Sequence, residues 1–438
     1  MKRQTKFKQT EIGMITEDWE VKELKEVTLQ IFSGGTPNTR KEKYWNGNLP
    51  WLSSGETRQT FIRDTERKIT KEGVDNSSTR LAKKEDVVVA GAGQGHTRGQ
   101  PSFCLIDTYI NQSVVVLRAN KEKLTPFFLF YNLLSRYDEL RQLSDAQSSR
   151  GSLTTKLLAD LFIKLPELEE QEIISKILSD LDSKIELNQQ MNKHLEAIGQ
   201  AIFKRWFIDF EFPNEKGKPY KSSGGEMVKS ELGEIPKGWK VEKLGDYGMF
   251  KNGINYLRGE TGDTDFFIAN VRDIANNKLL LKNSLDNISL NMKKARDYLL
   301  KDKDILIARS ASPGEVCEVS LVLGDLDKVI YSGFSIRYRL NNPNNYLYLF
   351  LIMQRLKENL SNFAVGTTLQ SVNQDTLKNM KFILPENRVL EKFNRIIEQI
   401  LERVYGNLIQ NNNLSQMRDS LLPRLMSGKI RVPVEVRA

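Results

Sequence analysis

The sequence has few of the residues that most often build metal and redox sites. Cysteine occurs twice in 438 residues, as Cys104 and Cys317, and histidine twice, as His96 and His194. These scattered residues lack the ligand spacing of a zinc site, and one cysteine pair is not a disulfide framework. We therefore expect no bound metal and two free, buried thiols, as is usual in a cytoplasmic protein.

Long hydrophobic runs are missing as well. The chain contains no stretch of roughly 18 uncharged apolar residues, the length that a membrane-spanning helix requires. The basic start at residues 1–6 is not followed by the apolar segment of a signal peptide. We therefore expect neither a membrane span nor a secretion signal.

Catalytic motifs are also missing. The phosphate loop of ATP-driven motors, Gly-x-x-x-x-Gly-Lys-Ser/Thr, does not occur. DNA amino-methyltransferases use Asn/Asp-Pro-Pro-aromatic, and the nearest match, 342–345, lacks the second proline and the ring. The glycines of 91–95 follow an apolar run as a phosphate-binding turn would, but no helical pattern follows them, so we interpret them as a hairpin loop. We expect no catalytic centre; a cryptic metal-dependent nuclease is the enzymatic alternative.

What the sequence does have is an excess of positive charge. The net charge is +9 and the pI about 9.2, which favours an anionic partner, nucleic acid before membrane. Residues 1–165 contain 26 basic and 20 acidic side chains, whereas 166–210 contain 5 basic and 9 acidic ones. The acidic segment is poorly suited to lie against phosphates, so we expect it to bind protein.

The chain contains an internal repeat. Residues 11–24 return as 231–244, with six identities in fourteen positions that include Trp19 and Trp239. Further similarities follow at nearly the same offset: 32–35 with 250–253, 86–90 with 304–308, 113–118 with 332–337, and 165–167 with 384–386. A nearly constant offset over most of the chain indicates a duplication.

Each half begins with short apolar runs separated by Gly, Asn, Ser and Pro, mixed with helical patterns, and closes with a long helical pattern after Leu-Pro-Glu. The fold class that this predicts is α+β (mixed α/β), with two repeated globular domains and two long antiparallel coiled-coil helices in a pseudo-twofold duplication. The predicted boundaries are a first domain at 1–165, a first helix at 166–210, a linker at 211–230, a second domain at 231–385 and a second helix at 386–430.

The two helical segments have matching heptad patterns. The predicted seam has an asparagine at the same central position of each helix, and its residues are Ile174, Leu181, Asn188, Leu195, Ile202, Phe393, Ile400, Asn407, Leu414 and Leu421. A companion row is expected three residues later in each helix, at 177, 184, 191, 198 and 205 in the first. A polar residue in such a seam costs stability but fixes register, so its matched placement favours pairing of the two helices. The alternative is that each helix packs on its own domain.

Several motifs in this order resemble the specificity subunits of type I restriction–modification systems. The likeness covers nearly the whole chain and rests on the segments 19–24, 33–37, 44–47, 49–52, 165–171, 201–210 and 421–430. The second half departs from the pattern at 252–255, where Asn-Gly-Ile-Asn replaces Gly-Gly-Thr-Pro. Each motif is modestly specific, whereas their order together with the duplication is highly specific.

The resemblance implies two target recognition domains, each reading one half of a split, asymmetric site in double-stranded DNA. It implies that the helices set the spacing and dock two modification subunits. S-adenosylmethionine would be bound by those methyltransferase subunits, and ATP and Mg by the restriction subunits, with no cofactor on this chain. A duplicated scaffold protein without DNA specificity is the alternative from a different class.

Loop residues that can read bases or hold phosphates are the candidate DNA contacts. In the first domain they are Arg40, Lys43, Tyr44, Ser53, Arg58, Gln94, His96, Arg98, Gln147, Ser148 and Arg150. In the second they are Lys251, Asn255, Tyr256, Arg258, Asn270, Arg272, Arg309, Ser310, Thr367, Thr368 and Gln370. The loops 94–98 and 309–314 are the favoured groups, because they occupy the same repeat position after a strand. Tyr44 could instead be a buried loop anchor.

Overall fold

The computed structural model describes residues 6–93, 97–146, 151–257, 259–312, 315–324, 326–361 and 370–433, without the side chains of 358–361 and 370. The chain forms two compact units. Unit 1 contains 1–187 and 411–438, and unit 2 contains 188–410. Both ends of the sequence therefore belong to the same unit.

Unit 1 is built on a five-stranded sheet. In spatial order its strands are β4 (Thr28–Ser33), β12 (Val114–Ala119), β9 (Val87–Ala90), β10 (Pro101–Cys104) and β6 (Phe61–Ile62). β9 and β12 are valine-rich, as expected of central strands whose two faces are both covered. One face packs against α3 (Pro126–Ser135), where the Phe127 ring stacks on Phe103 at 4.1 Å.

The other face of this sheet forms a separate core that includes Val88 and Val116, together with Leu52 and Ile110 of the second sheet. The second sheet has the order β7 (Arg67–Ile69), β5 (Trp45–Leu52), β11 (Thr108–Ile110) and β8 (Arg80–Ala82). Two short pairs complete the strands: β1 (Phe7–Thr10) with β2 (Gly13–Thr16), and β13 (Phe162–Leu165) with β3 (Glu20–Glu23).

Unit 1 contains parts of the two long helices α6 (Leu168–Phe203) and α12 (Asn387–Met426), and its other described helices are short. They are α1 (Leu24–Val27), η1 (Glu42–Tyr44), η2 (Ser54–Arg58), α2 (Lys71–Asp75), α3 (Pro126–Ser135), α4 (Tyr137–Asp145) and α5 (Thr155–Ala159). α3 begins where the Thr125 side chain accepts a hydrogen bond from the Phe128 amide and Pro126 occupies the first turn. α3 ends at Ser135 and α4 begins at Tyr137, so the two helices are separated by Arg136 alone.

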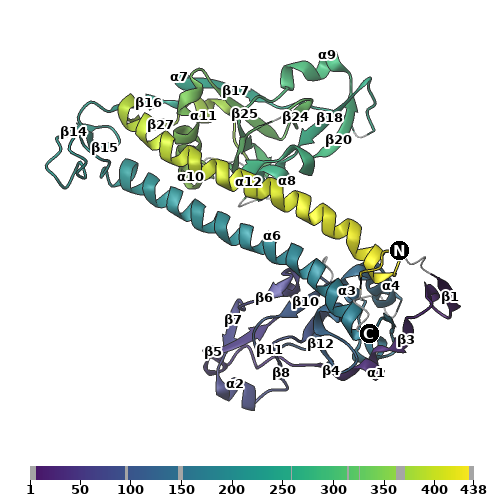
Figure 1. Ribbon diagram of the computed structural model, residues 1–438. Helices are drawn as coiled ribbons and strands as arrows, with labels where there is room; N and C mark the ends of the chain where they lie inside the picture. The colour runs from purple at the N-terminus through teal and green to yellow at the C-terminus, as the bar shows by residue number, and fades with distance from the viewer. Residues whose placement is uncertain are drawn as a thin grey trace. The chain divides into compact units, whose positions relative to one another are not determined.

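Unit 2 repeats this architecture (Figure 1). Its five-stranded sheet has the order β17 (Gly248–Asn252), β25 (Ser335–Leu340), β21 (Ile305–Ala308), β23 (Val319–Val322) and β19 (Leu279–Leu280). Its second sheet has the order β20 (Asp286–Leu290), β18 (Thr264–Ala269) and β24 (Val329–Tyr331). The short pairs are β14 (Met227–Ser230) with β15 (Gly233–Pro236), β16 (Lys240–Lys243) with β27 (Lys381–Leu384), and β22 (Ser310–Ala311) with β26 (Gln370–Ser371).

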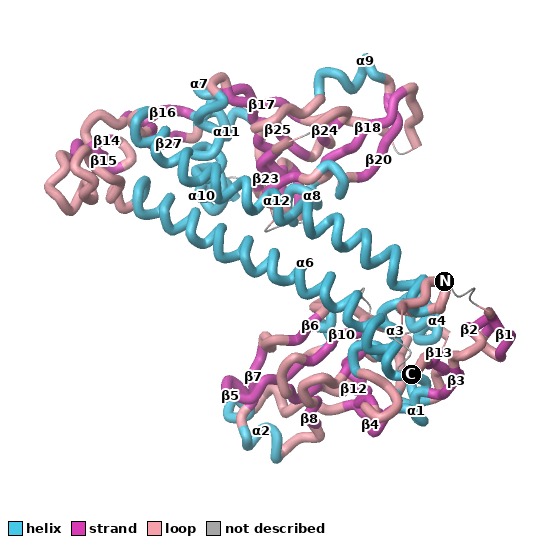
Figure 2. Tube along the Cα trace, viewed as in Figure 1, coloured by secondary structure: helices cyan, strands magenta, loops and turns pink. Residues whose placement is uncertain are grey.

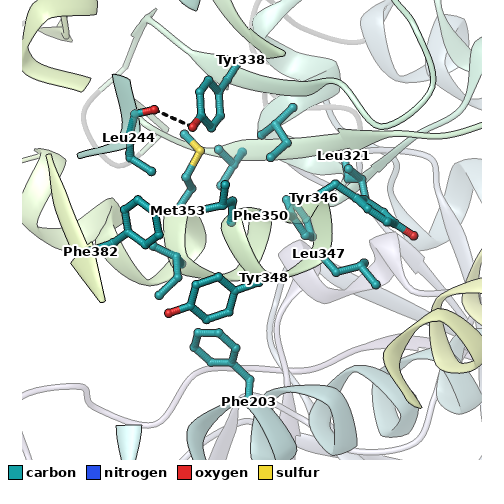
Figure 3. Close-up of a cluster of buried hydrophobic side chains, with 14 of the residues drawn as sticks. Phe203, Leu244, Leu321, Tyr338, Tyr346, Leu347, Tyr348, Phe350, Met353 and Phe382 are labelled. Carbon is teal, nitrogen blue, oxygen red and sulfur yellow. Dashed lines mark hydrogen bonds between the residues drawn. The ribbon is translucent and has the colours of Figure 1, made fainter. Parts of the chain in front are cut away.

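Short helices connect these strands, as Figure 2 shows. They are α7 (Leu244–Tyr247), α8 (Val271–Asn276), η4 (Lys282–Ser284), α9 (Met292–Ala295), η5 (Arg296–Tyr298), η6 (Pro343–Asn345) and α11 (Gln374–Asn379). The longer α10 (Tyr346–Ser361) packs on the five-stranded sheet, and Figure 3 labels side chains of this core from α10 (Tyr346, Leu347, Tyr348, Phe350 and Met353) and from the sheet (Leu321 and Tyr338). There the Tyr338 hydroxyl satisfies its hydrogen-bonding need by donating to the Leu244 carbonyl at 2.7 Å.

The duplication is therefore confirmed by topology, but one predicted match between the repeats is shifted. Arg118 pairs with the buried Asp86 in unit 1, and Arg339 pairs with the buried Asp304 in unit 2. These pairs make Arg339 the counterpart of Arg118, whereas the sequence alignment had matched Arg118 with Arg337. The second half has three more residues than the first between the aspartate and the arginine of this pair, so the offset between the repeats changes before this strand.

Both long helices extend from one unit into the other. α6 (Leu168–Phe203) continues as a π-helical turn, η3 (Lys204–Ile208), and α12 spans Asn387–Met426. Within unit 2 the two helices run antiparallel: Asn188 Nδ2 donates to Gln410 Oε1 at 2.7 Å, and Asn407 Nδ2 donates to Asn192 Oδ1 at 2.8 Å. Within unit 1, Asp182 of α6 pairs with Arg418 of α12 at 2.7 Å.

The predicted seam asparagines, Asn188 and Asn407, are both buried, as are Ile174 and Phe393. The other seam positions, Leu181, Leu195, Ile202, Ile400, Leu414 and Leu421, are partly buried. The companion row was predicted wrongly. It lies four residues after the seam, and its buried members are Leu178, Ile185, Asn192, Gly199, Ile397, Val404, Asn411 and Leu425. At the predicted companion positions, Ile177, Ile198, Ile396 and Met417 are instead exposed.

Segments that follow each long helix pack on the repeated tryptophans. Trp19 is buried in unit 1, and its indole donates to Glu170, which also accepts from Arg431 near the chain's carboxyl end. In unit 2 the Phe212 ring stacks on Trp239 at 5.0 Å. The segment 211–230, predicted to be a linker, is therefore folded against unit 2, because its apolar Phe212 is buried.

Candidate nucleic-acid interface

In each unit, loops from distant parts of the sequence meet at one end of the five-stranded sheet. In unit 1 the Leu153 amide donates to the Gly91 carbonyl, and the Gly91 amide donates to the Ser113 carbonyl, each at 2.7 Å. The Gly34 amide donates to Asn111 at 3.2 Å. We call the described segments 34–38, 91–93, 97–99, 111–113, 144–146 and 151–153 the loop surface of unit 1.

Unit 2 has the same arrangement. The Val372 amide donates to the Arg309 carbonyl at 3.0 Å, the Arg309 amide donates to Phe334 at 2.9 Å, and the Gly333 amide donates to Ile254 at 2.8 Å. The segments 253–257, 309–312, 332–334 and 370–372 form the loop surface of unit 2. In each unit, the loop after the central strand (β9 or β21) therefore lies against the segment before the last short helix (α5 or α11). The sequence had indicated these two regions separately as candidate DNA contacts.

Arg98, one of the favoured candidates, has a structural role in unit 1. Its side chain is 7% exposed and forms an ion pair with Asp145 of α4. Gly151 lies so close that a Cβ there would be 1.9 Å from Arg98 Nη1. A guanidinium held in this way fixes one loop against another, so the prediction that Arg98 reads DNA is not supported by its position.

Tyr44 is a buried loop anchor, the alternative considered for it. Tyr44 is 4% exposed, and Trp45 packs edge to face on Trp51 with ring centroids 5.0 Å apart. Lys43 pairs with Glu72 beside it. This cluster belongs to the second sheet of unit 1.

The other described candidates of unit 1 are polar surface or capping residues. Arg40 is exposed, and Arg58 pairs with Glu66 at 2.9 Å. Ser53 caps the helical turn η2, where its amide and hydroxyl both donate to Glu56. Arg58 remains available to an anionic partner because both members of its pair are exposed.

In unit 2, Asn255, Tyr256, Arg309 and Ser310 lie in the loop surface. Asn255 is exposed and Tyr256 is 36% exposed. Arg309 Nη1 donates to the Gly333 carbonyl at 3.4 Å, and Ser310 pairs with Ser371 in the β22–β26 ribbon. Position 309 is therefore a cation fixed at the edge of this surface.

The remaining described candidates of unit 2 lie elsewhere. Lys251 Nζ donates to the Asp297 carbonyl at 3.0 Å and lies over the Tyr298 ring. Asn270 caps α8 in a reciprocal capping box with Asp273, and Arg272 pairs with Asp286 at 2.5 Å. Burial raises the pKa of the Asp273 carboxyl, and the hydrogen bond that the carboxylate accepts from the Asn270 amide opposes this shift.

Some candidates lie outside the described residues: Gln94, His96, Gln147, Ser148, Arg150, Arg258, Thr367 and Thr368. The side chain of Gln370 is likewise not described. Sequence reasoning did not select Leu257 and Phe334, which are 78% and 59% exposed on the loop surface of unit 2. A search for polar readers passes over such residues, and in sequence they resemble core residues.

Arg337 is a further residue that the sequence did not single out. It lies on β25, is 5% exposed, and its Nε has no hydrogen-bond partner among the described residues. Its guanidinium lies 5.8 Å from the centroid of the Tyr331 ring. Burial raises the pKa of Tyr331 to about 12, and the charge of Arg337 opposes that shift.

Two negative findings apply to the described residues. Among them, no cluster of three or more His, Cys, Asp or Glu side chains could hold a metal ion. None of the helices they form is long and apolar enough to cross a membrane.

Two α+β units whose five-stranded sheets have the same strand order, joined to a pair of antiparallel helices and carrying equivalent loop surfaces, define a duplicated protein with two display surfaces. The family model described as "Type I restriction modification DNA specificity domain" matches residues 16–197 and 236–416. The chain belongs to this family and is a specificity subunit of a type I restriction–modification system.

Individual relatives cover nearly the whole chain. The MjaIX specificity subunit of Methanocaldococcus jannaschii is 29% identical and covers 98% of this chain and 97% of its own length. The HindI specificity subunit of Haemophilus influenzae is 24% identical and covers 87% and 94%. A crystal structure of the type I S subunit from M. genitalium has a TM-score of 0.58 at 13% identity and covers 93% and 96%, a likeness of fold.

Proposed function

We propose that this chain reads a split site in double-stranded DNA, each unit contacting one half through its loop surface. The observation that carries the proposal is that the same strand order builds the same loop surface twice, while the side chains on the two surfaces differ. A duplicated scaffold with different loops suits a site whose two halves have different sequences. Loops displayed by a rigid sheet are also a common location for recognition residues.

The two long helices would dock modification subunits. Apolar side chains stand exposed on them at equivalent repeat positions, Ile177 with Ile396 and Ile198 with Met417. An exposed apolar row on a helix that already has a buried seam is suited to a further helix. Because the row occurs once per repeat, two copies of one partner can use the same contacts.

A pair of equivalent clefts supports docking of two identical partners. The cleft of unit 1 has a volume of about 440 Å³ and is lined by residues that include Glu172, Ser175 and Lys176 of α6. The cleft of unit 2 has a volume of about 560 Å³ and is lined by residues that include Glu391, Asn394 and Arg395 of α12. Each cleft thus presents an acid, a small polar group and a base at matching positions.

The chemistry would come from partners. In this proposal the modification subunits bind S-adenosylmethionine and methylate the DNA, and restriction subunits supply ATP- and Mg-dependent cleavage. This chain would recognise the DNA sequence and set the distance between the two half-sites, and it would bind none of these cofactors. We expect the chain in the cytoplasm, where it would meet DNA.

A methylome tests the proposal. The chain would be co-expressed with the modification subunit encoded beside it, and methyladenine mapped by long-read sequencing. We expect a split motif with a fixed gap that is absent when this chain is omitted. A soluble complex that adds no methylation and binds no DNA would contradict the proposal and favour a scaffold role.

A further inference from the structure

The loop surface of unit 2 presents an exposed aromatic ring on a fixed backbone. Phe334 stands at the turn between β24 and β25 and is 59% exposed. Its carbonyl accepts hydrogen bonds from the amides of Arg309 at 2.9 Å and Ser310 at 3.1 Å. The ring therefore does not project from a loose loop, because two hydrogen bonds hold its backbone against the neighbouring segment.

A second exposed apolar side chain lies on the adjoining loop. Leu257 is 78% exposed, and its amide donates to Glu260 Oε2 at 3.0 Å. The two loops run side by side, since Gly333 approaches so closely that a Cβ there would be 2.0 Å from Asn255 Oδ1. Phe334 and Leu257 thus belong to one anchored surface.

Unit 1 shows that the fold does not require these apolar groups. At the equivalent place its loops are polar: Thr36 Oγ1 donates to Gln112 Oε1 at 2.6 Å, and the Ser113 amide donates to Asn111 Oδ1 at 3.0 Å. The large exposed hydrophobic residues described in unit 1 lie elsewhere: Phe7, Met14, Leu29, Ile177, Leu187 and Met417. The apolar character is therefore specific to the second recognition surface.

Charge indicates the occupant. The Arg309 guanidinium is hydrogen-bonded to the Gly333 carbonyl, so a cation lies beside the backbone that carries the Phe334 ring. In the DNA major groove, the thymine C5-methyl is the one apolar feature of the base edges, and phenylalanine can contact it. Anionic phosphates border the groove and suit the neighbouring arginine.

We propose that Phe334, supported by Leu257, contacts a thymine methyl group in the half-site read by unit 2. This inference rests on the proposed DNA-reading function and adds a chemical rule to it: one base pair of that half-site is recognised by an apolar contact.

The test uses the complex of this chain with its modification subunits, and duplexes that carry the methylated motif. Each thymine of the motif is replaced in turn by uracil, which lacks only the methyl group. We expect uracil at one position of one half-site to weaken binding by wild type roughly fourfold, the value of one buried carbon. The Phe334→Ala complex should bind thymine and uracil duplexes equally and should relax specificity at that base pair alone. Met249→Ala is the matched control, because Met249 is exposed in the same unit on the edge strand β17.

Each result decides the proposal. Uracil tolerated at every position, or a motif without thymine in the half-site that Phe334→Ala alters, would overturn it. A Phe334→Ala complex that keeps full specificity would also overturn it. If Phe334→Ala fails to assemble, the Phe334→Leu complex is tested, and assembly of that complex without discrimination between thymine and uracil would overturn the proposal as well. Failure of the wild-type complex to bind its own methylated motif would instead overturn the proposed function, and this inference with it.

Discussion

Asn407 of α12 donates a 2.8 Å hydrogen bond to Asn192 of α6 inside the helix pair of unit 2. Both side chains are buried, and Asn192 also donates to the Val404 carbonyl at 3.3 Å. A buried amide pair between two helices contributes little net stability but is satisfied in one register only. The asparagines therefore fix which residues of the two helices face each other.

Replacing one partner should cost more than replacing both. Asn407→Leu leaves an Asn192 oxygen without that donor, and we expect a loss of about 1–3 kcal/mol in the free energy of unfolding. The double variant Asn192→Leu/Asn407→Leu should recover most of this loss, with a preserved heptad but weaker register. Urea unfolding of the full chain measures both. Strictly additive effects of the two substitutions would contradict the pairing.

The two arginines of β25 should respond in opposite directions. Arg339→Met leaves the buried Asp304 without its ion-pair partner, and we expect a loss of about 3–5 kcal/mol. Arg337→Met removes a buried cation whose Nε has no acceptor among the described residues, and we expect a gain of about 1–3 kcal/mol. Thermal unfolding of the two variants forms a matched comparison. Destabilisation by Arg337→Met would show that this cation has a stabilising partner.

Arg98 and Arg309 should separate structure from recognition. Arg98→Met breaks the ion pair with Asp145 and should lower the stability of unit 1 by about 1–3 kcal/mol. Arg309→Met should leave the unfolding free energy nearly unchanged and weaken DNA binding at one half-site. Unfolding curves and half-site methylation of both variants check this. If the Arg98→Met protein is fully stable but loses specificity for one half-site, Arg98 contacts DNA and its structural role is overturned.

The exposed helical row should matter for assembly and not for folding. Ile198→Asp and Met417→Asp place a charge where the side chains are 50% and 53% exposed, so the unfolding temperature should change little. Binding of modification subunits should weaken by roughly tenfold or more for each, because a charge would be buried against an apolar partner. Size-exclusion chromatography of the co-expressed subunits measures this. Val404→Asp, at a buried position of the companion row, is the control that should unfold the helix pair.

The two thiols should be unreactive in the folded protein. Burial raises the pKa of Cys317 to about 11 and raises the pKa of Cys104 well above its ordinary value. At pH 8 only about one Cys317 in a thousand would be a thiolate. Because folding raises both pKa values, the stability that these thiols contribute is complete below about pH 8.5 and decreases as the pH rises. A thiol-reactive chromophore should label neither cysteine before unfolding and both after it.

Sequence alone determined the duplication, the fold class, the long helices and the family. These properties follow from periodic and repeated patterns, such as the similarity of Asp86–Ala90 to Asp304–Ala308. Such patterns depend only on the order of residues along the chain. The asparagines at 188 and 407 were identified by the same periodicity.

Only the tertiary structure decided which helical row faces the partner helix and which stands exposed. Ile177 and Leu178 are both apolar, and a sequence cannot tell whether the buried stripe continues three or four residues beyond Ile174. The role of a single polar residue depends in the same way on atoms distant in sequence. Arg98 and Arg309 occupy similar loops, yet one is closed in by Asp145 and Gly151 and the other lies at the edge of a surface beside Phe334. Burial is a property of the assembled chain, because it depends on which distant segments pack against each side chain.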